Sequence, residues 1–232
     1  MGSGATPRRF PVRNNWHPAE VACRSATWRA GVPGVMTESD RFTAMMQKSA
    51  ALKLRIATEL GSAVVGVVEA CECSLSNGGK LMFCGNGGSA ADSQHLATEL
   101  LVRLRPGKNR RSIAALALTL DPALLTAGGN DYGYDSVFER PLRGLGRAGD
   151  VLFGITTSGR SKNVILALQA AREMGIVTVG LLGGDGKPAI EACDHVLLVP
   201  DAKTARIQEC HIALGHAVLE LLEDRLIASG TA

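Results

Sequence analysis

The chain has 232 residues and a formal net charge of +3, with 46% hydrophobic, 20% charged and 4% aromatic residues. This length favours one sizeable domain, or one domain with an appendage, packed with aliphatic rather than aromatic side chains. The composition excludes a disordered or low-complexity class for most of the chain. No apolar run is long enough for a spanning helix and no basic start leads into an apolar segment, so we expect no membrane association, no secretory signal and a cytoplasmic location.

The first 35 residues differ from the rest of the chain. They hold both tryptophans, four of the nine prolines, and five arginines against Glu20 alone, which leaves 20 basic and 21 acidic residues for everything after. We predict that residues 1–35 are a poorly ordered appendage and that 36–232 form a single domain. An added leader, with Met36 as the natural start, fits this segment better than a transit peptide.

The near-neutral body of the chain argues against nucleic acid as a partner, because phosphate-backbone binding needs a clustered basic face. One basic cluster surrounds the turn at Pro106-Gly107. It is either a solvated loop or a positive rim that attracts an anionic substrate. Its members are Arg103, Arg105, Lys108, Arg110 and Arg111.

The six cysteines include no C-x-x-C pair. Neither a zinc knuckle nor a thioredoxin-type site follows from their spacing. We expect reduced, mostly buried thiols that pack as small hydrophobic side chains.

Apolar residues recur at helical spacing from about 40 to 76, which predicts one long helix or two shorter ones. After Asn77-Gly78-Gly79, short apolar runs alternate with amphipathic segments. This alternation predicts a five-stranded parallel sheet covered by helices on both faces, the doubly wound α/β class. The predicted strands are 80–84, 113–118, 150–155, 176–181 and 195–199, and the predicted helices lie near 90–104, 121–139, 161–174 and 204–227.

A glycine-rich segment, Gly85-Asn86-Gly87-Gly88-Ser89, follows the first predicted strand and leads into a helix. The glycines let the backbone turn tightly and approach a ligand, Ser89 is expected to cap the helix, and free N–H groups at the helix start favour an anion. This is a candidate sugar or phosphate loop, with a purely structural turn as the alternative. The dinucleotide pattern G-x-G-x-x-A also fits, but no acidic residue lies between Glu99 and Asp121 to bind a ribose.

A hydroxyl-rich segment, Thr156-Thr157-Ser158-Gly159-Arg160-Ser161, follows the third predicted strand. Hydroxyls, backbone N–H groups and a helix dipole would point to one place there, which suits a phosphate monoester. Ordinary helix capping by Ser158 or Ser161 is the alternative. Ligands of doubly wound folds bind at the carboxyl ends of the strands, where both loops lie.

His95 and Glu99 stand four residues apart on the helix behind the first loop. They share a helix face, so they could converge on a metal or on a substrate proton, although a surface hydrogen bond is the alternative. Asp131, among turn residues that break the next helical segment, could orient sugar hydroxyls or cap the following helix.

The last predicted helix carries polar side chains among apolar ones: Gln208, Glu209, His211 and His216. Gln208 and His216 are separated by about 12 Å of helical rise. They can face the same site only if a second element lies between them. Spacing does not select them over Glu209 and His211, and a buried structural histidine is the alternative for either imidazole.

Five motifs in unbroken order resemble those of the phosphoheptose isomerases of the sugar isomerase (SIS) superfamily, over about residues 38–227. The motifs are Gly85-Asn86-Gly87-Gly88-Ser89, the His95 and Glu99 pair, Gly129-Asn130-Asp131-Tyr132-Gly133, Thr157-Ser158-Gly159-x-Ser161, and Arg206-Ile207-Gln208-Glu209-x-His211 with His216 beyond. The resemblance implies the SIS fold and a homotetramer with active sites at subunit interfaces. It also implies conversion of sedoheptulose 7-phosphate to D-glycero-D-manno-heptose 7-phosphate through an enediolate, the first step toward nucleotide-activated heptose.

The resemblance also implies roles for individual residues. Phosphate would be held by Ser89, Thr156, Ser158 and Ser161, and the sugar by Asn86 and Asp131. Gly87, Gly88, Thr157 and Gln208 would also contact the substrate. One zinc per active site would be held by His95, Glu99, Gln208 and His216. Glu99 and His216 match the acid and base of the reaction, which needs a proton removed beside a carbonyl and a charge stabilised on its oxygen.

Two positions depart from the family pattern. Thr156 replaces a serine found in some members and keeps the hydroxyl, whereas Ala205 replaces an aspartate found in some members. Two other functions compete with the isomerase. One is a non-catalytic SIS-fold protein that senses sugar phosphates or associates with the replication initiator, and the other is a nucleotide-linked oxidoreductase, disfavoured by the missing ribose-binding acid.

Overall fold

The computed structural model describes residues 36–119 and 121–231. The described chain is divided into two units at Ala44 and Met45, and every residue of the candidate site belongs to the second. The predicted appendage, residues 1–35, lies outside the described residues, as does Cys23.

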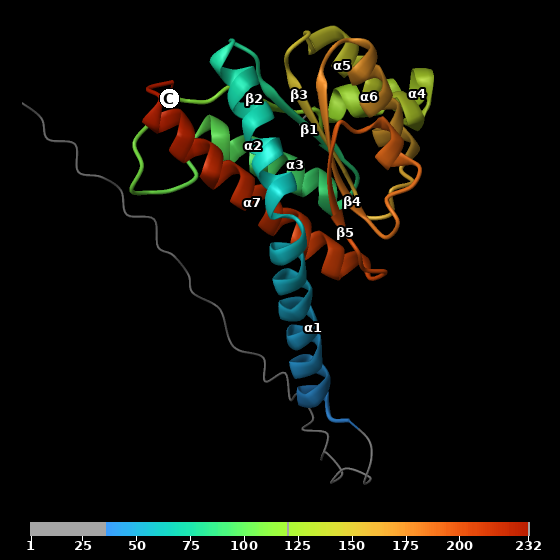
Figure 1. Ribbon diagram of the computed structural model, residues 1–232. Coiled ribbons are helices and arrows are strands. Elements are labelled where there is room, and N and C mark those ends of the chain that lie inside the picture. The colour runs from blue at the N-terminus through green and yellow to red at the C-terminus, as the bar shows by residue number, and fades with distance from the viewer. Residues whose placement is uncertain (1–35, 120, 232) are drawn as a thin grey trace, which may run out of the picture. The chain divides into compact units, whose positions relative to one another are not determined.

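Five parallel strands form the sheet, in the order β2-β1-β3-β4-β5 (Figure 1). They are β1 (Leu81–Gly85), β2 (Ala115–Ala117), β3 (Val151–Thr156), β4 (Val177–Gly183) and β5 (His195–Val199). The doubly wound parallel prediction is confirmed, with a second strand shorter than expected. The chain runs outward from β1 to β2 and then returns to β3, so the switch point of the sheet lies between β1 and β3.

Seven α-helices accompany the described strands: α1 (Glu38–Glu59), α2 (Gly61–Ser76), α3 (Gly88–Leu101), α4 (Pro122–Tyr132), α5 (Glu139–Leu145), α6 (Lys162–Glu173) and α7 (Thr204–Ala228). The helix predicted over 121–139 is divided because Gly133 has φ +81° and ends α4, after which come a 3₁₀ turn (Tyr134–Ser136) and α5. Among the described helices, none has the length and apolar character needed to cross a bilayer.

Alternate residues of each strand pack on opposite faces of the sheet. On one face, Leu81 and Phe83 contribute to a cluster formed with α2, α3, α7 and part of α1, and the rings of Phe83 and Phe153 stack with centroids 4.8 Å apart. On the other face, Met82 and Cys84 contribute to a cluster with α5 and α6. Continuous apolar strands are what a sheet covered on both sides requires.

The described cysteines match the prediction in part. Cys71, Cys84 and Cys210 are buried and Cys193 is half-buried, whereas Cys73 is exposed, and all five are free thiols. Burial raises the pKa of the Cys84 thiol to about 12, so this thiol is neutral at physiological pH.

His211 joins α7 to the sheet from inside the core. It is 1% exposed, and its Nε2 donates to the carbonyl oxygen of Leu182 on β4 at 3.0 Å. Its Nδ1 has no hydrogen-bond partner within the described part of the chain. A proton on Nδ1 would therefore be buried without an acceptor, and burial lowers the pKa of His211 from 6.5 to about 4.

We predict that His211 makes stability depend on pH. Below its unfolded pKa of 6.5 the unfolded chain binds a proton that the folded protein excludes until about pH 4. The free energy of unfolding should therefore fall by about 3 kcal/mol as pH falls through this window. Urea unfolding at several pH values measures this loss. H211Q, whose amide can still donate to Leu182, should lack this part of the dependence of the unfolding free energy on pH. An equal dependence on pH in both proteins would contradict the assignment.

Candidate active site

The loops that follow β1 and β3 meet at the switch point of the sheet. The amides of Asn86 and Asn163 pair reciprocally, each Nδ2 donating to the other's Oδ1 at 2.8 Å. The hydroxyl of Tyr134 also donates to Asn86 Oδ1, at 2.9 Å. The predicted convergence of the two loops is therefore observed, and the sequence reasoning missed Asn163 and Tyr134, which hold it.

The hydroxyl groups of the second loop gather at the start of α6. Thr156 Oγ1 lies 3.0 Å from Ser161 Oγ and 3.4 Å from Ser158 Oγ. Ser161 occupies the N-cap position, but its hydroxyl makes no capping hydrogen bond. Capping therefore does not account for this serine, and the first turn of α6 keeps N–H groups that favour an anion.

The first loop differs from its prediction in one respect. Gly87, with φ +58°, is the N-cap of α3, so Ser89 lies inside the first turn rather than capping it. Gly85 is needed for close packing, because a Cβ there would lie 2.7 Å from Ser89 Cβ and 3.0 Å from the Ile155 carbonyl oxygen. A Cβ on Gly88 would overlap the amide of Gln208. Glycines at 85 and 88 thus let the loop approach β3 and α7.

His95, Glu99 and His216 form a cluster between α3 and α7. Nε2 of His95 lies 2.7 Å from Nε2 of His216 and 3.3 Å from a carboxylate oxygen of Glu99. One donor atom from each of the three residues lies within 4.8 Å of the others. The side chain of His95 is 46% exposed and that of Glu99 19% exposed, so solvent and small molecules can reach the cluster.

The close approach of the two helices depends on Gly215, next to His216. A Cβ on residue 215 would lie 2.7 Å from a methyl carbon of Leu96, which is 1% exposed beside His95. Because residue 215 has no side chain, α7 can lie against α3 with the two imidazoles facing each other.

The structure separates the four polar candidates on α7. His216 lies in the cluster, while Gln208 contacts Gly88 at the start of α3. Glu209 accepts a hydrogen bond from Ser49 at 2.6 Å, and His211 points into the core. The alternative of a buried structural histidine therefore applies to His211 and not to His216.

Asp92 is a neighbour of the cluster that the sequence reasoning missed. It lies one turn before His95 on α3, and its Oδ2 is buried without a partner among the described residues. Burial raises the pKa of Asp92, and the charges of His95 and His216 oppose this rise. Its spacing of three residues from His95 is the signal that could have placed it on the same face.

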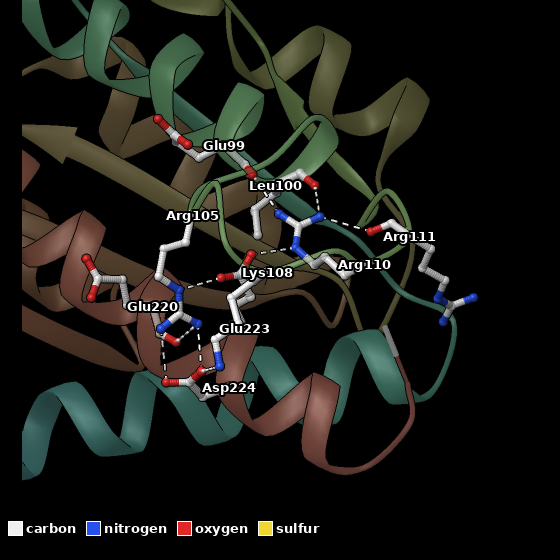
Figure 2. Close-up of polar contacts among 9 residues, drawn as sticks. All are labelled: Glu99, Leu100, Arg105, Lys108, Arg110, Arg111, Glu220, Glu223 and Asp224. Atoms are coloured by element: carbon white, nitrogen blue, oxygen red, sulfur yellow. Dashed lines mark hydrogen bonds and ion pairs between the residues drawn. The ribbon is translucent and has the colours of Figure 1, made fainter.

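Two further predicted features have different surroundings. Asp131 lies exposed on the last turn of α4 and accepts a hydrogen bond from Asn130 at 2.7 Å, so its contact with sugar stays a prediction. Part of the basic cluster is paired rather than free, while Arg103 and Arg111 are exposed. Arg105, Lys108 and Arg110 form ion pairs with carboxylates of α7 (Figure 2).

The donor atoms of the cluster fit a zinc ion. Two imidazole nitrogens and a carboxylate oxygen are ligands that zinc takes in catalytic sites with three protein ligands. The same groups can also hold and move a proton.

Comparison with known proteins decides the family. A family model described as "SIS domain" matches residues 45–183. Phosphoheptose isomerase from Paramagnetospirillum magneticum is 54% identical over 157 residues, which cover 68% of this chain and 81% of that protein. Phosphoheptose isomerase from Chlorobium phaeovibrioides is 48% identical over 182 residues, which cover 78% of this chain and 85% of that protein. The chain belongs to the phosphoheptose isomerases of the SIS-domain family.

Solved structures agree with this family. Phosphoheptose isomerase from Neisseria gonorrhoeae matches with a TM-score of 0.76 and 43% identity over 81% of this chain and all of that one. Phosphoheptose isomerase from Francisella tularensis matches with a TM-score of 0.78 and 33% identity, over 82% of this chain and all of that one. The family resemblance and the SIS fold are confirmed, and the chain is an aldose-ketose isomerase. The non-catalytic alternative is not favoured, and the strand order differs from the 3-2-1-4-5-6 order of the dinucleotide-binding fold.

We predict that Gly159 is required by the second loop. It has φ +68°, and a Cβ there would lie 2.5 Å from the Gly186 carbonyl carbon, a backbone atom that cannot rotate away. Gly184 is a matched control, with φ +65° and nothing within 4 Å of its Cβ position. G184A should cost about 1 kcal/mol through φ alone, whereas G159A should cost about 1–3 kcal/mol more.

The displaced loop in G159A should also raise KM for the sugar phosphate, because the Ser158 and Ser161 hydroxyls flank this residue. Urea unfolding and steady-state kinetics measure both effects. Equal stability and equal KM in G159A and G184A would contradict the prediction.

Proposed function

We propose that this isomerase converts sedoheptulose 7-phosphate to D-glycero-D-manno-heptose 7-phosphate at the cluster of His95, Glu99 and His216, the first step toward nucleotide-activated heptose. The observation that carries the proposal is the meeting of α3 and α7, which brings two imidazoles and a carboxylate together, two of them on the helix that follows the loop of β1. Family membership supports the substrate and the reaction.

Moving a carbonyl from C2 to C1 requires three functions. A base takes a proton from C1 of the ketose and a proton is returned to C2, a proton passes from the C1 hydroxyl to the C2 oxygen, and a positive group stabilises the enediolate between these steps. Glu99 and His216 are the acid-base pair in this proposal. Each has an atom that can hold a proton, and each reaches the place where the cluster's donor atoms converge.

The two loops bind the phosphate away from the reacting carbons. Ser89, Thr156, Thr157, Ser158 and Ser161 supply hydroxyl donors, and the first turns of α3 and α6 supply N–H groups. Asn86, the backbone of Gly87 and Gly88, Asp131 and Gln208 contact the sugar. Anchoring the phosphate orients C1 and C2 against the acid-base pair, so binding energy contributes to the rate.

We further propose one zinc per active site, held by His95, Glu99, Gln208 and His216. The donor types of His95, Glu99 and His216 support it, while Gln208 lies against Gly88 at the start of α3 and is included on the family resemblance. Bound there, the ion supplies Lewis-acid stabilisation of the carbonyl oxygen. Glu99 has two carboxylate oxygens, so one can hold the metal while the other takes the proton.

We also propose a homotetramer with active sites at subunit interfaces. An apolar groove runs between α1, α2 and α7, and Val65 and Leu221 are exposed large apolar side chains that line it. None of the residues of α4, which carries Asp131, is buried within the described part of the chain. A second copy of the chain is the partner that would cover these surfaces.

We also propose a cytoplasmic location. Five free cysteines among the described residues suit a reducing compartment.

The acid-base assignment predicts the effect of removing one carboxylate. E99Q keeps the shape of the side chain but cannot take a proton, so kcat for sedoheptulose 7-phosphate should fall by about 10²–10⁴-fold. E220Q, an exposed change on α7, is the control and should retain full activity. Folded E99Q that turns over at the wild-type rate would exclude Glu99 from the reaction.

The apolar groove predicts how the assembly can be broken. L221D puts a charge into the groove, so sedimentation velocity should show species smaller than a tetramer and the catalytic rate should fall with assembly. L145D, at an exposed apolar residue on α5, adds the same charge in the other layer of the fold and should leave the tetramer intact. A wild-type monomer, or a tetrameric L221D protein, would refute this interface.

A further inference from the structure

The active-site cluster joins residues that are 121 positions apart in the chain. His95 and Glu99 are on α3, and His216 is on α7, so the geometry of the cluster depends on how these two helices are held together. Near His95 the close contact of Leu96 with Gly215 holds them. Glu99 lies one turn further along α3, toward the end of this helix at Leu101.

The guanidinium of Arg110 caps that end of α3 (Figure 2). Its Nη2 donates to the backbone carbonyl of Glu99 at 2.7 Å, and its Nη1 donates to the carbonyl of Leu100 at 2.8 Å. Carbonyls in the last turn of a helix have no partner within the helix, so an arginine that bonds two of them fixes the position of that turn. One of these two carbonyls belongs to Glu99 itself.

The same guanidinium is tied to α7. Nε of Arg110 donates to Oε1 of Glu223 at 2.7 Å, and both side chains are only 1% exposed. Ion pairs removed from water in this way hold their geometry tightly, because neither charged group can be left buried without its partner. Arg110 therefore bonds the backbone of Glu99 on one side and the helix of His216 on the other.

Arg105 is a natural comparison for Arg110. It donates to the second oxygen of Glu223, Oε2, at 2.7 Å, and it also pairs with Asp224. Its remaining bond within the group goes to the carbonyl of Glu220. All the partners of Arg105 in this group are therefore on α7, whereas Arg110 alone reaches α3 (Figure 2).

We infer that Arg110 is a positioning residue for the reaction, which acts through Glu223 to fix the last turn of α3 against α7 and thereby places Glu99 relative to His216. The inference rests on the proposed function of the cluster. The fork of the guanidinium is essential to this role, because a lysine has one nitrogen and cannot bond two carbonyls and a carboxylate in these separate directions.

The test is R110K, which keeps the positive charge beside Glu223, with R105K as the matched control at the same carboxylate. In R110K, kcat for sedoheptulose 7-phosphate should fall by about 10- to 100-fold, while KM changes by no more than about twofold because the phosphate loops are untouched. The dissociation constant for Zn²⁺, measured by calorimetry on the full metal-free chain, should rise by about 10- to 100-fold. R105K should leave kcat, KM and zinc affinity unchanged.

Wild-type kcat and zinc affinity in R110K would overturn the inference, as would an equal loss in R105K, which would make the effect one of general stability. If R110K does not fold, E223D retains both charges and shortens the carboxylate, and it should lower kcat in the same way. A wild-type chain without turnover would refute the proposed function. The zinc measurement would then still decide the positioning role.

Discussion

The close crossing of α3 and α7 is the constraint on which the site depends. Neither helix forms the site by itself, because His95 and Glu99 lie on α3 and His216 lies on α7. The Nε2 atoms of the two imidazoles are 2.7 Å apart. Two contacts hold the crossing: the packing of Leu96 on Gly215 and the buried pair of Arg110 and Glu223. A side chain at residue 215 or, by the inference above, a shorter cation at residue 110 would change the distance between Glu99 and His216, the proposed acid-base pair.

The sheet supplies the second half of the site. The order of the strands puts its switch point between β1 and β3, and the loops after these two strands are the ones rich in glycine and hydroxyl groups. The pairing of Asn86 with Asn163 holds them together. In the proposed function, the loops bind the phosphate and the helix crossing carries the proton transfer, so the anchored end of the substrate lies away from its reacting carbons.

Much of this could be predicted from the sequence, because local patterns carry it. Apolar runs bounded by glycines predicted the parallel strands, and a spacing of four residues predicted that His95 and Glu99 share a helix face. Spacing could not distinguish His216 from His211, because only packing of α7 on the sheet decides which imidazole points at Leu182 and which at α3. The ion pairs of the basic cluster could not be predicted for a similar reason. Arg110 pairs with Glu223, which is 113 residues away in the chain, and no local pattern indicates such a pair.

The central claim is that α3 and α7 together form one metal-holding acid-base site. Anomalous diffraction at the zinc edge, from crystals of the full chain grown with zinc, tests it most directly. The account predicts one zinc peak per chain, bonded to Nε2 of His95, Nε2 of His216, the carboxylate of Glu99 and the amide oxygen of Gln208. A chain with no peak there, or with zinc bound elsewhere while His95, Glu99 and His216 point apart, would contradict it.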